Sequence, residues 1–281
     1  MFSRFLGTYL QARDHPAKRR IVGWLAKSVI PAEGIETRLP DGLVFFLHPR
    51  DTIEYILLRG EKYEPATLAL LQANLGPGDG AVLAGTNFGL HVAVSARAVG
   101  ADGKVVGVEP QAAAVLRTRL NLERNGLASR VDLLQAALGA TPEILQMAWS
   151  KVENSGAASL FDRGEGFRVP AVRLEAAVQL LAPRRFRLLL LDVQGYELHA
   201  LAGADLKRGP DIAIIELDPE FLRHSGTSPE SIADLLMRND YQLFDVYGRE
   251  VSRFDSPLPE RNLVAKRPTA QISWPKKFEP L

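Results

Sequence analysis

Acidic residues stand where three hydrophobic runs of this sequence end. Glu109 follows Val105–Val108, Asp192 follows four consecutive leucines, and Glu216 closes a run that begins at Ile212. Burying a carboxylate without a partner or a wet cleft is costly, so acids in these places are expected to face a ligand site. Such a carboxylate can accept hydrogen bonds from a ribose diol, or it can take a proton from a reacting hydroxyl.

The turn from Gly85 to Gly89 is a second candidate ligand-binding element. Its two glycines let the backbone approach a ligand closely, and the helix that follows points free N–H groups at it. The turn lacks the Gly-x-Gly-x-x-Gly fingerprint, which favours a ligand without a pyrophosphate; a tight turn that binds no ligand is the alternative. Glu109 follows the turn by about 20 residues, a separation typical of an acid that holds a ribose.

Polar residues also follow the four-leucine run, in the stretch Asp192-Val193-Gln194-Gly195-Tyr196-Glu197. We assign a functional role to Asp192, because it ends a strongly hydrophobic strand. Glu197 lies in the first turn of the next helix, where the helix dipole favours an anion. For Glu197, a catalytic role and that of an ordinary acid at a helix start both remain open.

The histidines do not have the spacing of metal ligands, and no metal site is expected. His91 and His199 each lie early in a helix beside the expected crevice, where either contacts a substrate or serves the structure alone. The sequence contains no Gly-x-Ser-x-Gly nucleophile elbow and no phosphate-loop lysine. The histidines of the chain are His15, His48, His91, His199 and His224.

From residue 81 onward, strand and helix patterns alternate strictly. This succession predicts an α/β fold with a Rossmann-like, doubly wound, mostly parallel sheet and helices on both faces. Ligands of such sheets bind outside the carboxyl ends of the strands. The expected strands are residues 81–84, 105–108, 131–134, 187–192 and 212–217, with closing strands at 241–246 and 263–265. The expected helices are residues 90–99, 112–125, 196–206 and 229–238.

An N-terminal helical and hairpin extension is expected to precede this domain. Asp41-Gly42 marks the hairpin turn between two apolar runs. The basic residues 1–30 indicate either a helix that contacts a membrane surface or a partner, or, as the favoured interpretation, the solvated face of a packed helix. Residues 140–168 are interpreted as a lid or substrate loop. The expected divisions are residues 1–60, 61–270 and an irregular tail at 271–281.

The composition excludes several classes of protein. The 281 residues include no cysteine, which removes disulfides, zinc-thiolate sites and a thiol nucleophile. Lys and Arg number 34 against 33 Asp and Glu, so the net charge of +1 does not suit a protein that neutralises nucleic-acid phosphates. No apolar stretch reaches the roughly 18 residues of a membrane span, and residues 1–30 lack the features of a signal peptide. We therefore expect a cytoplasmic protein.

Several motifs, in agreeing order and spacing, resemble the FkbM-type methyltransferases over about residues 62–247. The resemblance implies a class I methyltransferase fold, S-adenosyl-L-methionine as cofactor, and O-methylation of a sugar or small metabolite. Agreement across the set is far more specific than any single motif. The motifs are Gly85–His91, Val105–Pro110, Asn121–Leu127, Ala136–Gly139, Val172–Leu174, Leu191–Glu197 and Ile215–Glu216.

The same resemblance implies roles for individual residues. Glu109 would hold the ribose, the residues from Gln135 to Ala137 would lie beside the adenine, and Asp192 would face the reacting methyl group. Asp192 is the predicted catalytic base or hydroxyl-orienting group, with Glu216 and His199 as further catalytic candidates. The implied cofactor-binding residues are Tyr63, Glu64, Gly85, Asn87, Gly89, His91, Glu109, Pro110, Gln135, Ala136 and Ala137.

Two positions depart from the family pattern. Leu83 stands where the family usually has an acid, and Gln194 stands where it usually has Glu. A Gln side chain keeps the shape and hydrogen bonding of Glu but neither acts as a base nor balances a cation. A catalytically impaired or non-catalytic binding protein with this fold is therefore the alternative function. A nicotinamide-dependent oxidoreductase is a second rival, which the missing third glycine disfavours.

Overall fold

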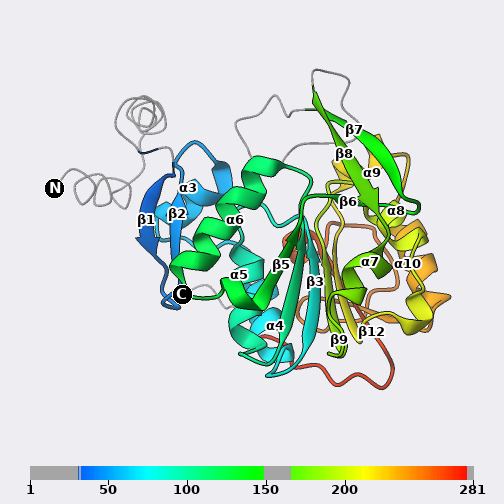
Figure 1. The fold of residues 1–281 in the computed structure, drawn as a ribbon. Coiled ribbons are helices and arrows are strands. Elements are labelled where there is room, and N and C mark those ends of the chain that lie inside the picture. The colour runs from blue at the N-terminus through cyan, green and yellow to red at the C-terminus, as the bar shows by residue number, and fades with distance from the viewer. Residues whose placement is uncertain (1–30, 32, 149–165, 277–281) are drawn as a thin grey trace.

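The computed structural model describes residue 31 and residues 33–148 and 166–276. Within these residues, a seven-stranded sheet forms the centre of the molecule (Figure 1). Its strands, in spatial order, are β11 (Gln242–Asp245), β12 (Asn262–Lys266), β10 (Ile212–Glu216), β9 (Phe186–Leu191), β3 (Gly80–Ala84), β4 (Lys104–Val108) and β5 (Val131–Leu134). The strands from β10 to β5 are parallel, whereas β12 and β11 are antiparallel to their neighbours.

This topology confirms the predicted doubly wound α/β fold. The chain moves outward from β3 to β4 and β5, and then returns to β9, which pairs with the other edge of β3. The strand order therefore reverses between β3 and β9, and ligands of such sheets bind beyond the strand ends at that point. Gly85 and Asp192 are the first residues after these two strands, and the Asp192 N–H donates to the Ala84 carbonyl at 3.1 Å.

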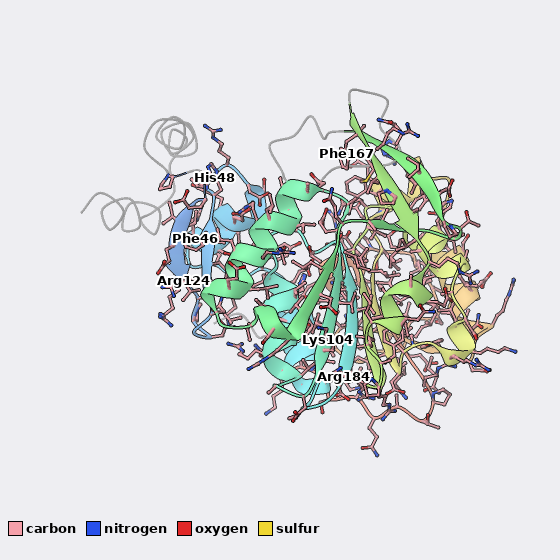
Figure 2. All side chains as sticks on the ribbon, viewed as in Figure 1. Phe46, His48, Lys104, Arg124, Phe167 and Arg184 are labelled. Carbon is pink, nitrogen blue, oxygen red and sulfur yellow. The ribbon has the colours of Figure 1, made fainter. Side chains whose placement is uncertain are left out.

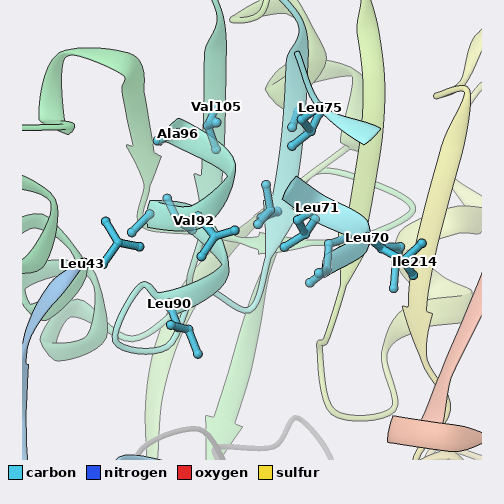
Figure 3. Packing of buried hydrophobic residues seen from close by; sticks show 14 of the residues in the cluster. Leu43, Leu70, Leu71, Leu75, Leu90, Val92, Ala96, Val105 and Ile214 are labelled. Carbon is cyan, nitrogen blue, oxygen red and sulfur yellow. The ribbon is translucent and has the colours of Figure 1, made fainter. Parts of the chain in front are cut away.

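Helices cover both faces of the sheet. Side chains alternate along each strand, so Leu188 packs into the core on one face and Leu189 into the core on the other. Figure 3 shows the first core, where Leu70 and Leu71 lie near Ile214 and where Ala96 lies near Val105. The first face carries α4 (Pro65–Asn74), α5 (Leu90–Ala98) and α6 (Ala112–Arg124); the second carries α7 (Leu174–Gln179), α8 (Glu197–Ala202) and α10 (Pro229–Met237).

The hairpin predicted around Asp41-Gly42 is confirmed as β1 (Ile35–Arg38) and β2 (Val44–Leu47), followed by α3 (Thr52–Leu58). Side chains of α6 and of its C-cap residue, Asn125, bind the free edge of β2. Asn125 accepts from the Val44 N–H at 2.8 Å and donates to the Val44 carbonyl at 2.6 Å, and Asn121 accepts from the Phe46 N–H at 2.8 Å. The two asparagine side chains thus satisfy backbone groups that a neighbouring strand would otherwise pair with, and they join the hairpin to the rest of the described structure.

The interpretation of residues 140–168 as a loop is wrong at both of its ends. A small sheet orders β6 (Ala137–Leu138), β8 (Gly166–Val172) and β7 (Glu143–Ala148), with β7 and β8 antiparallel. Pro170 within β8 disguised the strand, because proline donates no hydrogen bond to a ladder. Met147 pairs with Phe167 across the two strands, and residues 149–165 lie outside the described part of the chain.

Two short helices were not predicted, α7 and α9 (Pro219–His224), and α8 ends at Ala202 rather than at residue 206.

Figure 2 shows Phe167 at the end of the molecule where the carboxyl ends of the parallel strands lie, with Lys104 and Arg184 at the opposite end. Across the described residues, no helix combines the length and apolar character that crossing a bilayer requires. The predicted basic helix in residues 1–30 falls outside them, so its membrane or partner contact stays a prediction.

Candidate active site

A pocket of about 250 Å³ opens beyond the carboxyl ends of the parallel strands, at the reversal between β3 and β9. It is bounded by the turns after β3, β4, β9 and β10 and by the small sheet. Its lining residues are Ile53, Tyr63, Ala84, Gly85, Asn87, Val108, Glu109, Pro110, Gln111, Ala136, Ala137, Leu138, Met147, Asp192, Val193, Gln194, Tyr196, Glu216, Asp218, Phe221 and Arg261.

Glu109 is buried at the end of β4, with 4% of its surface exposed. Its two carboxylate oxygens accept the N–H groups of Gln111 at 3.0 Å and of Asn87 at 3.1 Å. Burial raises the pKa of Glu109 to about 7, although these hydrogen bonds oppose the shift. Backbone donors thus fix the carboxylate in the pocket wall, where its remaining lone pairs are available to a diol.

The turn after β3 is held closed against the sheet and against α6. A Cβ atom at Gly85 would lie 1.8 Å from the Asp192 carbonyl oxygen, so only glycine permits the two strand ends to meet here. The Thr118 hydroxyl donates to the Asn87 carbonyl and the Asn121 amide to the Phe88 carbonyl, each at 2.8 Å. The turn is therefore rigid before any ligand arrives.

Tyr63, Glu64 and His91 meet beneath this turn. The His91 Nε2 atom lies 3.1 Å from a Glu64 carboxylate oxygen, and the Tyr63 and His91 rings are 6.4 Å apart. Burial lowers the pKa of His91, but the nearby carboxylates of Glu64, Asp192 and Glu260 together raise it, so the net shift is upward. The pair joins the segment before α4 to the first turn of α5.

Two carboxyl groups from adjacent strands meet at the centre of the pocket. Asp192 follows β9 and Glu216 ends β10, and their carboxyl groups share a hydrogen bond. The Gln194 side-chain amide donates to Asp192 Oδ1 at 2.9 Å and to Glu216 Oε2 at 3.3 Å. Burial raises the pKa of both carboxyls, and that of Glu216 lies well above its usual range. The shorter of the two amide contacts is the one to Asp192, which favours the negative charge of the pair on Asp192.

The far wall of the pocket is polar and hydrogen-bonding. Asp218 begins α9, accepts the Glu220 N–H at 2.8 Å, and receives the Arg261 guanidinium on its other oxygen. The Arg261 side chain is 56% exposed at the mouth. Tyr196 lies alongside, its ring stacked on His199 with 4.4 Å between centroids.

The structure brings most of the predicted site residues to this pocket. Asp192 and Glu216 line it, as do Tyr63, Gly85, Asn87, Glu109, Pro110, Ala136 and Ala137. His91 lines a small adjoining cavity under the turn. Four further predicted residues line neither the pocket nor this cavity: Glu64, which pairs with His91; Gly89, the N-cap of α5; Gln135, which is exposed; and His199, which stacks on Tyr196.

Sequence reasoning missed several lining residues on the far wall. Asp218 carries a detectable signal, because Asp followed by Pro219 is a strong helix-start pattern directly after β10. Arg261 comes from the turn before β12, and nothing in its local sequence points to a site. Met147 belongs to the strand β7 that was interpreted as a loop.

Leu83 does not fill the space that an acid would occupy in the pocket. Its side chain points into the core on the first face of the sheet and is 1% exposed. The pocket therefore stays open beside Gly85, and Glu109 faces it.

The residues present fit S-adenosylmethionine. Glu109 is placed to accept a ribose diol, and the small apolar side chains of Pro110, Ala136 and Ala137 line the part suited to a flat adenine ring. Asp192 lines the same pocket, and a carboxylate can balance a sulfonium charge. Among the residues that the structure describes, no cluster of His, Asp and Glu has the arrangement of a metal site.

Comparison with solved structures yields distant similarities. An S-adenosylmethionine-dependent O-methyltransferase from Thermotoga maritima is 15% identical, with 79% of this chain and 72% of that chain covered and a TM-score of 0.43. An rRNA methylase from Streptococcus thermophilus is 13% identical over 72% and 94%, with a TM-score of 0.40. An O-methyltransferase from Bacillus cereus in complex with SAH is 13% identical over 94% and 95%, with a TM-score of 0.38. Similarities this weak add nothing to the assignment.

Sequence comparison is decisive for the family. No curated protein matches the chain. A family model described as the Methyltransferase FkbM domain matches residues 84–243, which run from the end of β3 into β11 and include the turns after β3, β4, β9 and β10. The chain therefore belongs to the FkbM methyltransferase domain family and is an S-adenosylmethionine-dependent methyltransferase.

Proposed function

We propose that this methyltransferase transfers the methyl group to a hydroxyl oxygen of a sugar or another small metabolite. The observation that supports this choice best is the position of the Asp192 carboxylate, between the cofactor side of the pocket and its polar far wall. A neutral hydroxyl must lose its proton as the new bond forms, and a carboxylate at this point can receive that proton.

The far wall suits an acceptor with several hydroxyl groups. Gln194, Tyr196 and the paired side chains of Asp218 and Arg261 offer both donors and acceptors there. Arg261 is the one cation among the described lining residues, and Asp218 neutralises it. The remaining carboxylates disfavour a phosphate-rich acceptor, so we propose a carbohydrate or small molecule rather than nucleic acid.

S-adenosylmethionine, when bound, supplies an electrophilic methyl group whose bond to sulfur breaks as the bond to the acceptor oxygen forms. The protein holds the reactants in line and excludes water. Asp192 Oδ2, the oxygen that does not accept from Gln194, takes the hydroxyl proton, and the Asp192–Glu216 pair becomes neutral. Solvent removes that proton after the methylated acceptor has left.

Replacing the base separates binding from catalysis. We expect Asp192→Ala to retain binding of S-adenosylhomocysteine in calorimetry while transfer of labelled methyl to a panel of sugars and small hydroxylated acceptors falls by about 100-fold or more. Asp205→Ala, an exposed aspartate outside the pocket, is the matched control. Full activity in Asp192→Ala would contradict the role of the base. A cofactor that binds while no hydroxyl of the panel is methylated would favour the non-catalytic binding protein.

A further inference from the structure

Gln194 occupies an unusual position in both its backbone and its contacts. Its φ angle is +54°, in the left-handed region that non-glycine residues rarely adopt. Glu197 holds this conformation in place, because one of its oxygens accepts the N–H groups of Val193 at 3.0 Å and of Gly195 at 3.1 Å, on either side of Gln194. Strain at a functional site persists only where the surroundings enforce it.

That conformation directs a neutral amide at two acids. The Gln194 Nε2 atom carries two hydrogens, and the structure places it 2.9 Å from Asp192 Oδ1 and 3.3 Å from Glu216 Oε2. One NH₂ group can therefore donate to both carboxyls at once. A Glu at this position would instead bring a third carboxyl group to the same point and have no donor to offer when ionised.

We propose that Gln194 is a positioning residue of the reaction: its amide holds the Asp192–Glu216 pair in the form with one proton and one negative charge, located on Asp192. The inference rests on the proposed function, in which that charge receives the hydroxyl proton. Gln194 is then the residue that keeps a crowded acidic site competent, and its departure from the family pattern is functional rather than a sign of lost catalysis.

The charge balance around the pair supports this assignment. Glu64 and Glu197 add negative charge near Glu216, and Glu109 lies near Asp192 on the β4 side. The positive charge of His91 on α5 opposes this negative charge. The Arg261–Asp218 pair at the mouth adds no net charge, and Tyr63 is neutral. Adding a further carboxyl here would favour protonation of Asp192, and a neutral donor favours its ionised form.

The test uses equilibrium binding of two ligands that differ in one charge. S-adenosylmethionine carries a sulfonium and S-adenosylhomocysteine does not, so the ratio of their affinities reports the charge that faces the sulfur. In the unmodified protein we expect this ratio to rise in a step as pH increases, because Asp192 ionises; Glu109 and Glu197, whose pKa values burial raises to about 7, contribute to the rise in every Gln194 variant. Gln194→Met removes both hydrogen bonds, and we expect the midpoint of the step to move up by about one pH unit.

Gln194→Glu is a second variant that tests the same proposal if Gln194→Met folds poorly. The third carboxyl repels the charge on Asp192, so the midpoint again moves upward, and at high pH the preference for S-adenosylmethionine exceeds that of the unmodified protein. Gln242→Met, on the exposed side of β11, is the matched control and leaves the midpoint unchanged. A merely structural role for Gln194 would weaken both ligands equally and leave the midpoint in place.

The outcomes separate this inference from the proposed function. A ratio without pH dependence in the unmodified protein, or identical midpoints in all Gln194 variants, overturns the role of Gln194 alone. Failure of both ligands to bind the unmodified protein would overturn the cofactor site itself. Normal pH behaviour with no methylated hydroxyl would keep the contact of Gln194 with the acidic pair, remove the proposed acceptor class, and favour the non-catalytic binding protein.

Discussion

The carboxyl groups in this pocket differ in their hydrogen-bond partners, and these partners determine what each group can do. Glu109 is held by backbone N–H groups and is suited to accept hydrogen bonds from a ligand. Asp192 accepts the Gln194 amide on Oδ1, and in the proposed mechanism its other oxygen takes the proton. Glu197 uses one oxygen to hold the turn around Gln194, which is a structural role.

The raised pKa of the buried Glu109 leads us to predict that the folded protein loses stability as pH rises. The pKa of Glu109 is raised to about 7 in the folded state, above its value of 4.5 in an exposed environment, so the folded protein binds the proton more tightly than the unfolded chain. The stability that this contributes is fully present below pH 4.5 and is lost as pH rises through 7, by roughly 3 kcal/mol at most. We expect the melting temperature of the ligand-free protein to fall from pH 5 to pH 8.

Scanning calorimetry of Glu109→Gln at the same pH values is the control. Gln does not titrate, so the fall between pH 5 and pH 8 should be smaller than in the unmodified protein, whatever the absolute stability of the variant. Equal slopes in the two proteins would show that Glu109 is ionised throughout. Glu197, whose pKa burial also raises to about 7, accounts for part of the slope that remains.

At the scale of elements, the pocket depends on contacts between segments far apart in the sequence. Glu260, in the turn before β12, accepts the N–H groups of Ala66 at 2.7 Å and Thr67 at 2.8 Å, and also the Thr67 hydroxyl at 2.7 Å. The first turn of α4 has no side-chain cap of its own, so a residue almost 200 positions away supplies one. The same turn presents Arg261 to the pocket.

Removing this cap should loosen both α4 and the pocket mouth. We expect Glu260→Ala to lower the free energy of unfolding by about 2–3 kcal/mol, because charge-assisted hydrogen bonds are lost and the helix dipole is left uncompensated. Urea denaturation measures the change, with Glu123→Ala on the exposed side of α6 as the control. Glu260→Gln should recover part of the loss, and a change below about 0.5 kcal/mol in Glu260→Ala would contradict the capping role.

For the molecule as a whole, the hairpin and the central sheet form one cooperative unit. Leu43, Phe45 and Leu47 belong to the same core cluster as Leu83 of β3. α6 contributes to both parts, since Asn121 donates to the turn at the pocket and accepts from β2. Packing and hydrogen bonds therefore join the hairpin of the expected extension, residues 1–60, to the expected domain, residues 61–270.

This coupling predicts a single unfolding transition. We expect Asn125→Ala to lower stability by about 1–3 kcal/mol, because the Val44 N–H and carbonyl lose their partners, and to lower the melting temperature of the entire protein. Hydrogen exchange should show the Val44 and Phe46 amides opening together with those of β3. Gln72→Ala on α4, which is exposed, serves as the control. Separate melting of the hairpin would refute the coupling.

Local patterns were sufficient for much of this protein. Runs of apolar residues bounded by Gly and Pro located β3, β4, β5, β9 and β10 within a residue or two, because buried parallel strands have a composition that is independent of their partners. Acids at strand ends then identified Glu109, Asp192 and Glu216, since the topology of a doubly wound sheet brings its carboxyl ends to one edge. The same patterns failed for β7 and β8, which have little hydrophobic contrast and a proline.

The amino-acid sequence by itself determined the fold class, the family and the acids that line the pocket, because periodicity and turn chemistry are local properties. Only the tertiary structure decided what surrounds those acids. Gln194, interpreted from the sequence as a lost charge, is the donor that joins Asp192 to Glu216, and Glu260 caps a helix that begins at residue 65. Both depend on distances between strands and turns that come together only when the chain has folded.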